Sequence, residues 1–209
     1  MKPWQKTSNL LSLLIFLLFF LSTSIQIASS LPLVYFFQDL SGVYSQSSDR
    51  LLKQKITKTT LSYVKGENFP LPFTPKENFH LKEVRQVFSK GKKIWLFSCS
   101  VALPLLIYFS FFAQEKIRPL GRFLTILFLF FDLCLLFAFP YFFRLFHQIL
   151  FSPGSWQFGK DSLLLQLFPY QFWVIQSFFV FSLAAFLSSL TFFFLRSFSN
   201  FQDRILRSK

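Results

Sequence analysis

Residues 94–114 read IWLFSCSVALPLLIYFSFFAQ and carry no charged side chain. Two further stretches have the same character. Residues 123–143 read FLTILFLFFDLCLLFAFPYFF and hold a single charge, Asp132, while residues 162–195 hold none. A helix of about 20 apolar residues crosses the hydrocarbon core of a bilayer. Each stretch reaches that length, so the sequence predicts three membrane spans.

A fourth apolar stretch lies near the start of the chain and has two interpretations. Residues 7–38 carry no charge and are long enough to span a membrane. The positive start, the apolar core and the small residues Ala28 and Ser30 also resemble a signal peptide that is removed. We favour a retained first helix, which gives an all-α membrane protein with four transmembrane helices.

The predicted spans cover residues 8–31, 94–114, 123–146 and 172–195 of a single integral membrane domain, residues 1–209. Composition agrees, because only 15% of the residues are charged, against about a quarter in soluble domains. In such a chain the net charge of +13 reports topology and contact with anionic lipids, so no nucleic acid partner is predicted. Cys99 and Cys134 fall inside spans, where they suit packing, and their spacing is not that of a metal site.

The distribution of basic residues predicts which side of the membrane each connection faces. Lysine and arginine are concentrated at both ends of the chain and in a short loop expected at residues 115–122. The positive-inside rule places these regions in the cytoplasm and residues 33–93 outside. This outer segment nevertheless holds 11 of the 22 basic residues, which leaves the inverted arrangement open. We predict a multi-pass protein of the cytoplasmic (inner) membrane with both termini in the cytoplasm.

The outer segment is predicted to form a small helical extracytoplasmic cap between the first two spans. One helix should fill much of residues 47–66, where spaced apolar residues are followed by Gly66. Three prolines then interrupt the chain. A second helix should begin at Thr74, because Thr74 and Glu77 form a capping box and Pro75 suits the first helical position.

His80, one of only two histidines in the chain, lies on that second helix. Glu77 and Glu83 are three residues away on either side, so they are its neighbours on the helix surface. A carboxylate beside an imidazole orients the ring and raises its basicity, as a general base requires. The simpler alternative is a surface helix of mixed charge in which Glu77 only caps, and the spacing alone favours that alternative.

His147, the other histidine, follows the third span at the predicted outer headgroup level, with Arg144 one turn before it. A nearby cation favours the neutral imidazole. The simpler alternative is an interfacial histidine beside an arginine that extends toward water. Both histidines are predicted on the same face of the membrane. We therefore expect their rings to lie within about 10 Å of each other and to share acid–base work on one substrate.

Other kinds of site have weaker support in the residues. No serine lies in a Gly-x-Ser-x-Gly turn, so any nucleophile would come from the substrate. His80 and Glu83 could be two ligands of a metal, but the chain lacks a His-Glu-x-x-His pair, and neither a metal nor another cofactor is predicted. Asp132 is about 22 Å along a helix from His147. We expect Asp132 to have a structural polar partner on another span.

Two segments resemble the signatures of a known family. Residues 73–88 read FTPKENFHLKEVRQVF and resemble the Phe-x-x-x-Glu-x-x-His-x-x-Asp-Val segment of the Lit family, the bacterial lipoprotein intramolecular transacylases. Residues 146–173 read FHQILFSPGSWQFGKDSLLLQLFPYQFW and resemble its second signature, in which Phe-His is followed by Ser-Trp-x-Phe and then by Leu-Phe-Pro-x-x-Phe-Trp. The resemblance covers essentially the whole chain.

The resemblance implies an acyltransferase with a catalytic pair of histidines, matched here by His80 and His147. Enzymes of this family move an acyl chain from the glyceryl sn-2 oxygen of a diacylglyceryl lipoprotein to the α-amine of its N-terminal cysteine, which gives the lyso form. One imidazole would take the amine proton while the other protonates the departing oxygen. Further catalytic residues are expected to be Glu77, Glu83 and Arg144, and substrate-binding residues Phe146, Trp156, Phe158 and Trp173.

Two positions depart from the family pattern. Glu83 stands where the family prefers aspartate, and the acid expected shortly after Trp173 is absent. The main alternative, from another class, is a non-enzymatic four-span membrane protein that binds lipid or a partner protein and uses its histidines structurally. Histidines that lie together would favour the enzyme, and widely separated histidines would favour the alternative.

Overall fold

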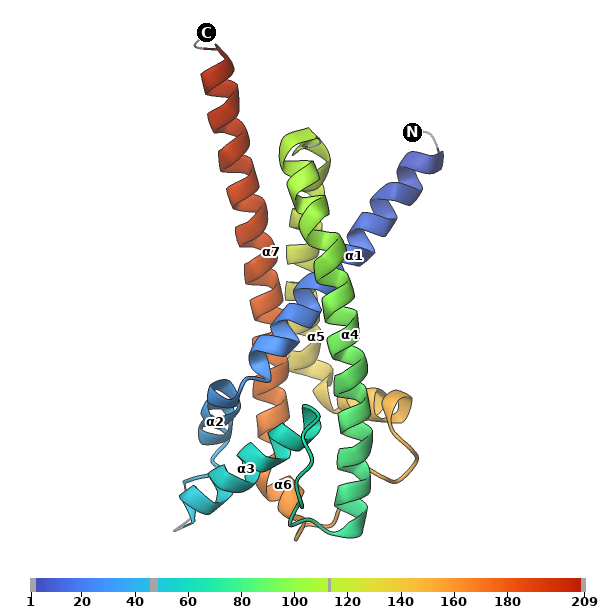
Figure 1. The fold of residues 1–209 in the computed structure, drawn as a ribbon, viewed down its shortest axis with the longest axis vertical. Helices are drawn as coiled ribbons and strands as arrows, with labels where there is room; N and C mark the ends of the chain where they lie inside the picture. The colour runs from blue at the N-terminus through green and yellow to red at the C-terminus, as the bar shows by residue number, and fades with distance from the viewer. Residues whose placement is uncertain (1–2, 46–48, 113, 208–209) are drawn as a thin grey trace. The chain divides into compact units, whose positions relative to one another are not determined.

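The computed structural model describes residues 3–45, 49–112 and 114–207, and every regular element within them is a helix (Figure 1). The helices are α1 (Pro3–Ala28), α2 (Leu31–Leu40), α3 (Arg50–Val64), α4 (Pro75–Phe112), α5 (Gln114–Leu150), α6 (Leu163–Leu167) and α7 (Tyr170–Arg207). Four of them, α1, α4, α5 and α7, are long and apolar enough to cross a membrane. The predicted all-α fold with four such helices and a helical segment between the first two is confirmed.

Two boundaries differ from the sequence prediction. The predicted second cap helix and the second span form one continuous helix, α4, and Gly91 does not interrupt it. The loop predicted at residues 115–122 is wrong, because α5 already begins at Gln114. Glutamine, glutamate, lysine and arginine are good helix formers, so these residues extend the helix rather than end it. Residue 113, between α4 and α5, lies outside the described ranges.

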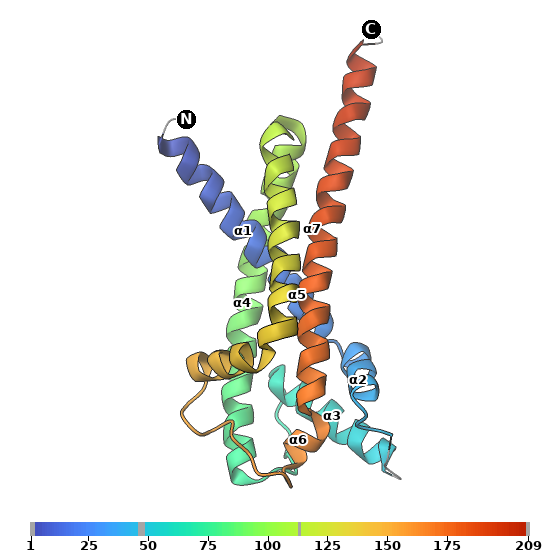
Figure 2. The same ribbon diagram turned by 180° about the vertical axis from the view of Figure 1, so that it is seen from behind.

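Prolines inside transmembrane helices are expected to kink them, because proline cannot donate to the preceding turn. Helix α4 continues through Pro104. Helix α5 is broken at Ala138, whose φ of −130° and ψ of 18° are not helical, two residues before Pro140 (Figure 2). The residues after the break, 139–150, carry His147 at their end.

The described residues cluster into two compact units. Unit 1 comprises Met1–Ile25, Lys93–Leu133 and Val180–Lys209, and unit 2 comprises Gln26–Lys92 and Cys134–Phe179. The core of unit 1 packs phenylalanines against small residues, namely Phe16, Phe20, Ala102, Leu124, Phe128, Ala184, Ala185 and Phe192. Small residues let transmembrane helices approach closely, which strengthens their van der Waals packing. This packing, rather than burial from water, holds the unit together within a bilayer.

Polar contacts add to the packing of unit 1. Ser182 Oγ on α7 donates to Asp132 Oδ2 on α5 at 2.8 Å. The predicted polar partner of Asp132 on another span is thereby confirmed as Ser182. Thr125 and Ser188 join the same two helices, with 3.0 Å between their hydroxyl oxygens. A polar group in hydrocarbon needs such a partner, because no water is available to satisfy it.

Gly121 provides a test of the packing in unit 1. A Cβ atom built at Gly121 would overlap the ring of Phe192, whereas one built at Gly91 meets nothing within 4 Å. We expect Gly121→Ala to destabilise the protein by about 1–3 kcal/mol, the usual cost of overpacking. Gly91→Ala, the matched control on α4, should be neutral or slightly stabilising because alanine favours helix. Thermal unfolding of the purified protein in detergent measures both variants, and equal midpoints would contradict the packing described here.

Within unit 2, the fully buried polar side chain of Gln38 on α2 bonds to three neighbouring segments. Its Nε2 donates to Thr57 Oγ1 on α3 at 3.0 Å and to the carbonyl of Leu167 on α6 at 2.7 Å. Its Oε1 accepts from the hydroxyl of Tyr44 at 2.5 Å. Burial raises the pKa of Tyr44 to about 12, so the hydroxyl stays protonated and remains a donor. Gln38 therefore ties α2, α3 and α6 together.

Candidate active site

The start of α4 is fixed by Glu77, which is 2% exposed. Its Oε2 accepts from the amide and the hydroxyl of Thr74 at 2.9 and 2.7 Å, so the predicted capping box is confirmed. Its Oε1 accepts from Ser162 Oγ at 2.5 Å and from the amide of Leu164 at 3.0 Å. One carboxylate thus joins the N-termini of α4 and α6. Both oxygens of Glu77 are occupied by these donors, and the structure records no bond from Glu77 to His80.

His80 lies one turn further along α4, and its ring faces that of His147 at the end of α5. The two ring centroids are 6.2 Å apart and the rings are inclined by 22°. The proximity expected from the sequence is therefore confirmed. His80 is 7% exposed and His147 8% exposed, so both imidazoles are almost removed from solvent. Figure 2 shows the end of α5 running across α4 within unit 2.

Glu83 is the carboxylate that faces His80. His80 Nδ1 and Glu83 Oε2 are 3.8 Å apart, and both atoms are buried without a hydrogen-bond partner. The other oxygen, Oε1, accepts from the amide of Ser152 at 2.9 Å. One end of the carboxylate is therefore anchored to the chain after α5 and the other points at the imidazole. A movement of about 1 Å would turn this contact into a direct hydrogen bond.

His147 is oriented by its own helix. Its Nδ1 lies 2.7 Å from the carbonyl oxygen of Phe143, one turn earlier on α5. A carbonyl can only accept, so the proton sits on Nδ1. The opposite nitrogen, Nε2, is then the unprotonated one and is the atom that can accept a proton or a hydrogen bond from a substrate.

Aromatic side chains surround the two imidazoles. The Phe151 ring contacts both of them, with centroids 4.7 Å from His80 and 5.2 Å from His147. Phe158 lies 5.6 Å from His80, and Trp156 lies 4.9 Å from His147. A site with such walls excludes water and strengthens every electrostatic interaction inside it.

Of the other residues singled out from the sequence, one contacts the imidazoles and two do not. Phe146 contacts His147 at a centroid distance of 5.4 Å, as a residue of the site would. Arg144 is exposed, and within the described residues no hydrogen bond or ion pair joins it to either histidine. Trp173 contacts Phe168 and Phe172 and donates to the Phe168 carbonyl at 3.1 Å. Trp173 therefore anchors the start of α7 and has no recorded contact with the imidazoles.

The structure adds residues that the sequence analysis missed. Phe151 contacts both histidines, and the Phe143 carbonyl sets the tautomer of His147. Both residues are four positions from His147, and the amide of Phe151, just past the end of α5, still donates to the His147 carbonyl, so their place beside it could have been predicted had the helical spacing been continued to residue 151. Ser152 contributes only its backbone amide, for which the sequence carries no signal.

The metal alternative has no support in the described side chains. Within the described ranges, no three side chains of histidine, cysteine, aspartate or glutamate gather closely enough to hold a metal ion. The arrangement that the structure does provide is a pair of imidazoles beside the partly buried carboxylate of Glu83. That set suits proton transfer in a site from which water is excluded.

Comparison with known proteins gives the same family as the two signatures. Two solved structures of the membrane integral lipoprotein intramolecular transacylase Lit from Bacillus cereus share the fold. One matches with a TM-score of 0.72 and 18% identity over 95% of this chain and 99% of that chain. The other carries a single histidine-to-arginine mutation and matches with a TM-score of 0.73 and 16% identity over 96% of each chain. No curated protein matches significantly.

The family assignment rests on a sequence profile, not on these two structures alone. The profile described as lipoprotein intramolecular transacylase Lit matches residues 10–173, which include both histidines, Glu83 and the whole of the aromatic site. This is more than half of the chain, and the predicted resemblance is confirmed. The chain belongs to the Lit family of lipoprotein intramolecular transacylases, and it is a multi-pass membrane acyltransferase.

Proposed function

We propose that this protein moves an acyl chain within a diacylglyceryl lipoprotein, from the glyceryl sn-2 oxygen to the α-amine of the N-terminal cysteine. The ester C–O bond breaks, an amide C–N bond forms, and one proton passes from the amine to the glyceryl oxygen. The reaction is balanced without water or a co-reactant. The observation that supports it best is that the only two histidines of the chain lie 6.2 Å apart beside a partly buried carboxylate, that of Glu83.

The geometry supports different roles for the two imidazoles. We assign the proton transfer to His80, because Glu83 lies beside its Nδ1 and would stabilise the imidazolium formed when Nε2 takes the amine proton. The same nitrogen can return the proton to the departing glyceryl oxygen, as histidine does in hydrolase triads. His147 presents an unprotonated Nε2, which can accept a hydrogen bond from the amine and hold it in line with the ester.

The aromatic surroundings suit the substrate class. Acyl chains are apolar, and Phe151, Trp156 and Phe158 offer apolar surface directly against the imidazoles. Exclusion of water also protects the ester from hydrolysis, which would compete with transfer to the amine. We propose Phe146 as a further contact of the acyl chain, since its ring lies beside His147 and is half exposed.

The decisive experiment follows from the fact that the reaction is an isomerisation. The intact mass of the lipoprotein N-terminal peptide does not change when an acyl chain moves within it. Mild alkaline hydrolysis separates the isomers, because the diacylglyceryl form loses two ester-linked chains whereas the lyso form keeps one as an amide. We expect cells that express this protein to yield peptides with a base-stable N-acyl chain, and cells with an empty vector to yield none. Identical peptides from both would leave the non-enzymatic alternative.

We further propose that both termini face the cytoplasm and that the histidine site faces the opposite side of the membrane. The concentration of basic residues at the two ends of the chain supports this orientation. In a variant whose two native cysteines are replaced by serine, a cysteine introduced at Ser45 should react with an impermeant thiol reagent in intact cells. A cysteine introduced at Gln202 should react only after lysis. The opposite pattern would invert the topology.

Glu83 is expected to act as a positioning residue for His80. Glu83→Gln keeps the shape and the acceptor for Ser152 but removes the charge that stabilises the imidazolium. We expect transfer to be about 10- to 100-fold slower, with the loss falling in kcat rather than KM, since general acid–base assistance contributes 10²–10⁴-fold. Glu83→Asp restores the charge with a shorter reach and should recover part of the rate. Glu83→Gln with wild-type kcat would show that the carboxylate only anchors Ser152.

A further inference from the structure

Three buried polar atoms in the histidine site have no hydrogen-bond partner. Among the described side chains of unit 2, His80 Nδ1, Glu83 Oε2 and Ser155 Oγ are the only atoms in this condition. Buried polar atoms almost always have a partner, because a group that has left water without one is costly. Three such atoms in one site indicate groups that bond to one another during the reaction. The proton transfer assigned above uses the imidazole and the carboxylate and leaves Ser155 without a role.

Ser155 is held beside Glu83 by a turn that Glu83 itself anchors. The amide of Ser155 donates to the carbonyl of Ser152 at 3.1 Å, and the amide of Ser152 donates to Glu83 Oε1 at 2.9 Å. The hydroxyl of Ser155 interacts with the same carboxylate, although it is not aligned for a full hydrogen bond. Ser155 is 6% exposed, and the next residue, Trp156, packs against His147 at a centroid distance of 4.9 Å. The hydroxyl is therefore confined to the histidine site.

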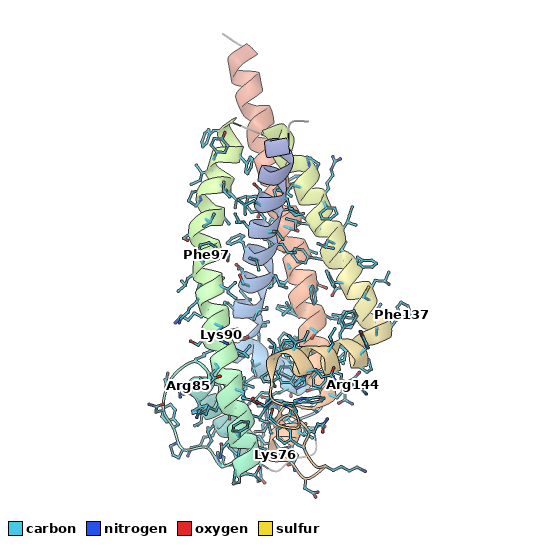
Figure 3. All side chains as sticks on the ribbon, turned by 90° about the vertical axis from the view of Figure 1, so that its right-hand side faces the viewer. Lys76, Arg85, Lys90, Phe97, Phe137 and Arg144 are labelled. Carbon is cyan, nitrogen blue, oxygen red and sulfur yellow. The ribbon has the colours of Figure 1, made fainter. Side chains whose placement is uncertain are left out.

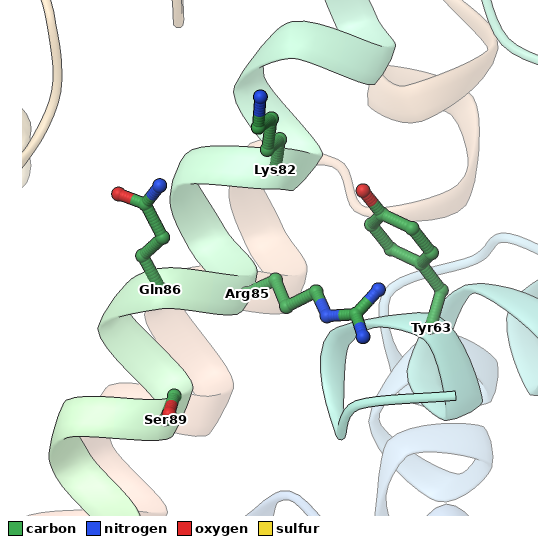
Figure 4. Close-up of a pocket in the computed structure, with 5 residues that line it drawn as sticks. All are labelled: Tyr63, Lys82, Arg85, Gln86 and Ser89. Atoms are coloured by element: carbon green, nitrogen blue, oxygen red, sulfur yellow. The ribbon is translucent and has the colours of Figure 1, made fainter. Parts of the chain in front are cut away.

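The cations that flank Glu83 in the sequence are not its partners. Lys82 and Arg85 lie together with Tyr63 on a different face of α4 (Figure 4), and the Arg85 guanidinium is 4.9 Å from the centroid of the tyrosine ring. Figure 3 shows Arg85 on one side of α4 and the end of α5, marked by Arg144, on the other. Within the described ranges neither flanking cation forms an ion pair with Glu83. The donors available to the free oxygen of this carboxylate are therefore the imidazole and the serine hydroxyl.

We propose that Ser155 is a positioning residue, whose hydroxyl donates a hydrogen bond to Glu83 Oε2 and holds this oxygen against His80 Nδ1. The inference rests on the proposed acyl transfer and deepens it. A carboxylate oxygen has two lone pairs, so it can accept from the hydroxyl and the imidazole at once. With Oε1 fixed by the Ser152 amide and Oε2 by the hydroxyl, the carboxylate cannot rotate away when the imidazolium forms. Ser155 thereby acts through Glu83 and not on the substrate.

The test measures formation of the base-stable N-acyl chain by the purified full-length protein in detergent, with a diacylglyceryl lipopeptide as substrate. Ser155→Ala should lower kcat about 5- to 10-fold and leave KM unchanged, a smaller loss than in Glu83→Gln. Ser155→Cys keeps the shape but is a weak donor, so it should be slowed similarly, whereas Ser155→Thr keeps the hydroxyl and should recover most of the rate. Gln157→Ala removes an exposed side chain from the same segment and should match wild type.

Two further measurements separate positioning from a structural role. In a Glu83→Gln protein, Ser155→Ala should lower kcat by less than about twofold more, because the charge through which the hydroxyl acts is already absent. The unfolding midpoint of Ser155→Ala should stay within about 2 °C of wild type, since the hydroxyl makes no complete hydrogen bond in the resting protein.

The contrary results distinguish a failure of this inference from a failure of the proposed function. Wild-type kcat in Ser155→Ala would overturn the role of Ser155 and leave acyl transfer intact. The same fold loss in the Glu83→Gln background as in the wild type would do so too, because it would show that the hydroxyl acts independently of the carboxylate. A lipopeptide that gains no N-acyl chain even with the wild-type protein would instead refute the acyl transfer, and this inference with it.

Discussion

Replacing either histidine with alanine should abolish the formation of lyso-form lipoprotein, and replacing both should be little worse than replacing one. His80 and His147 lie 6.2 Å apart and are both almost removed from solvent, so both imidazoles could reach the same amine and the same ester. Loss of a general acid–base group costs about 10²–10⁴-fold in rate. Residues that work as a unit lose most of the activity on the first deletion. The base-stable N-acyl chain of the lipoprotein peptide is the measurement.

A matched control separates catalysis from folding. Gln148 is exposed beside His147 on α5, and Gln148→Ala should keep wild-type activity. All variants should reach the membrane in equal amount and unfold at similar temperatures in detergent. Independent losses, in which the double variant is worse by the product of the two single effects, would rule out joint action on one substrate. A fully active single variant would exclude that histidine from the chemistry.

Glu77→Gln should cause the largest loss of stability of any single polar substitution in unit 2. The carboxylate accepts four hydrogen bonds, from the amide and hydroxyl of Thr74, the hydroxyl of Ser162 and the amide of Leu164. Glutamine would place an NH₂ group against two of these donors and would lose the charge that strengthens the other two bonds. Hydrogen bonds to charged groups contribute about 1.5–3 kcal/mol each. We expect a total loss of about 3–5 kcal/mol, measured as a lower unfolding midpoint.

Activity should fall with stability in this variant, because Glu77 holds the segment that follows the aromatic site against the start of α4. Asp161→Asn is the control. It removes a neighbouring carboxylate that is exposed, and its midpoint should stay within about 1 °C of wild type. A Glu77→Gln protein with an unchanged midpoint and full activity would show that the buried carboxylate does not join α4 to α6.

Much of the fold follows directly from the sequence. Uncharged runs of about 20 residues are sufficient to predict membrane helices, because a charge in hydrocarbon is costly. The capping box at Thr74 and Glu77 and the stop at Gly66, whose φ is 120°, are local signals and were predicted correctly. The prediction of a loop at residues 115–122 is wrong, because α5 already begins at Gln114. Basic residues are typical of cytoplasmic connections, but lysine and arginine are also good helix formers.

The candidate site was only partly predictable. The two histidines were chosen because they are rare and match the family signatures, and the family profile over residues 10–173 confirms the membership. Their distance could be expected only from a shared membrane face, since 66 residues separate them in the sequence. The break at Ala138 before Pro140 and the chain that follows it place His147 beside α4.

The sequence by itself determined the four apolar helices, the start of α4, the family and the identity of the two imidazoles, because each depends on local composition or on short spacing. It did not distinguish Glu77 from Glu83, which are equally spaced from His80. Only the tertiary structure decided between them. The N-terminus of α6 donates to Glu77 and saturates it, whereas the chain after α5 binds one oxygen of Glu83 and leaves the other facing the imidazole. A carboxylate is available to a histidine only where no backbone amide or hydroxyl has taken its oxygens. Thr74 takes one oxygen of Glu77 locally, but the donors to its other oxygen and the donor to Glu83 come from residues about 70 to 90 positions away, beyond the reach of any local pattern.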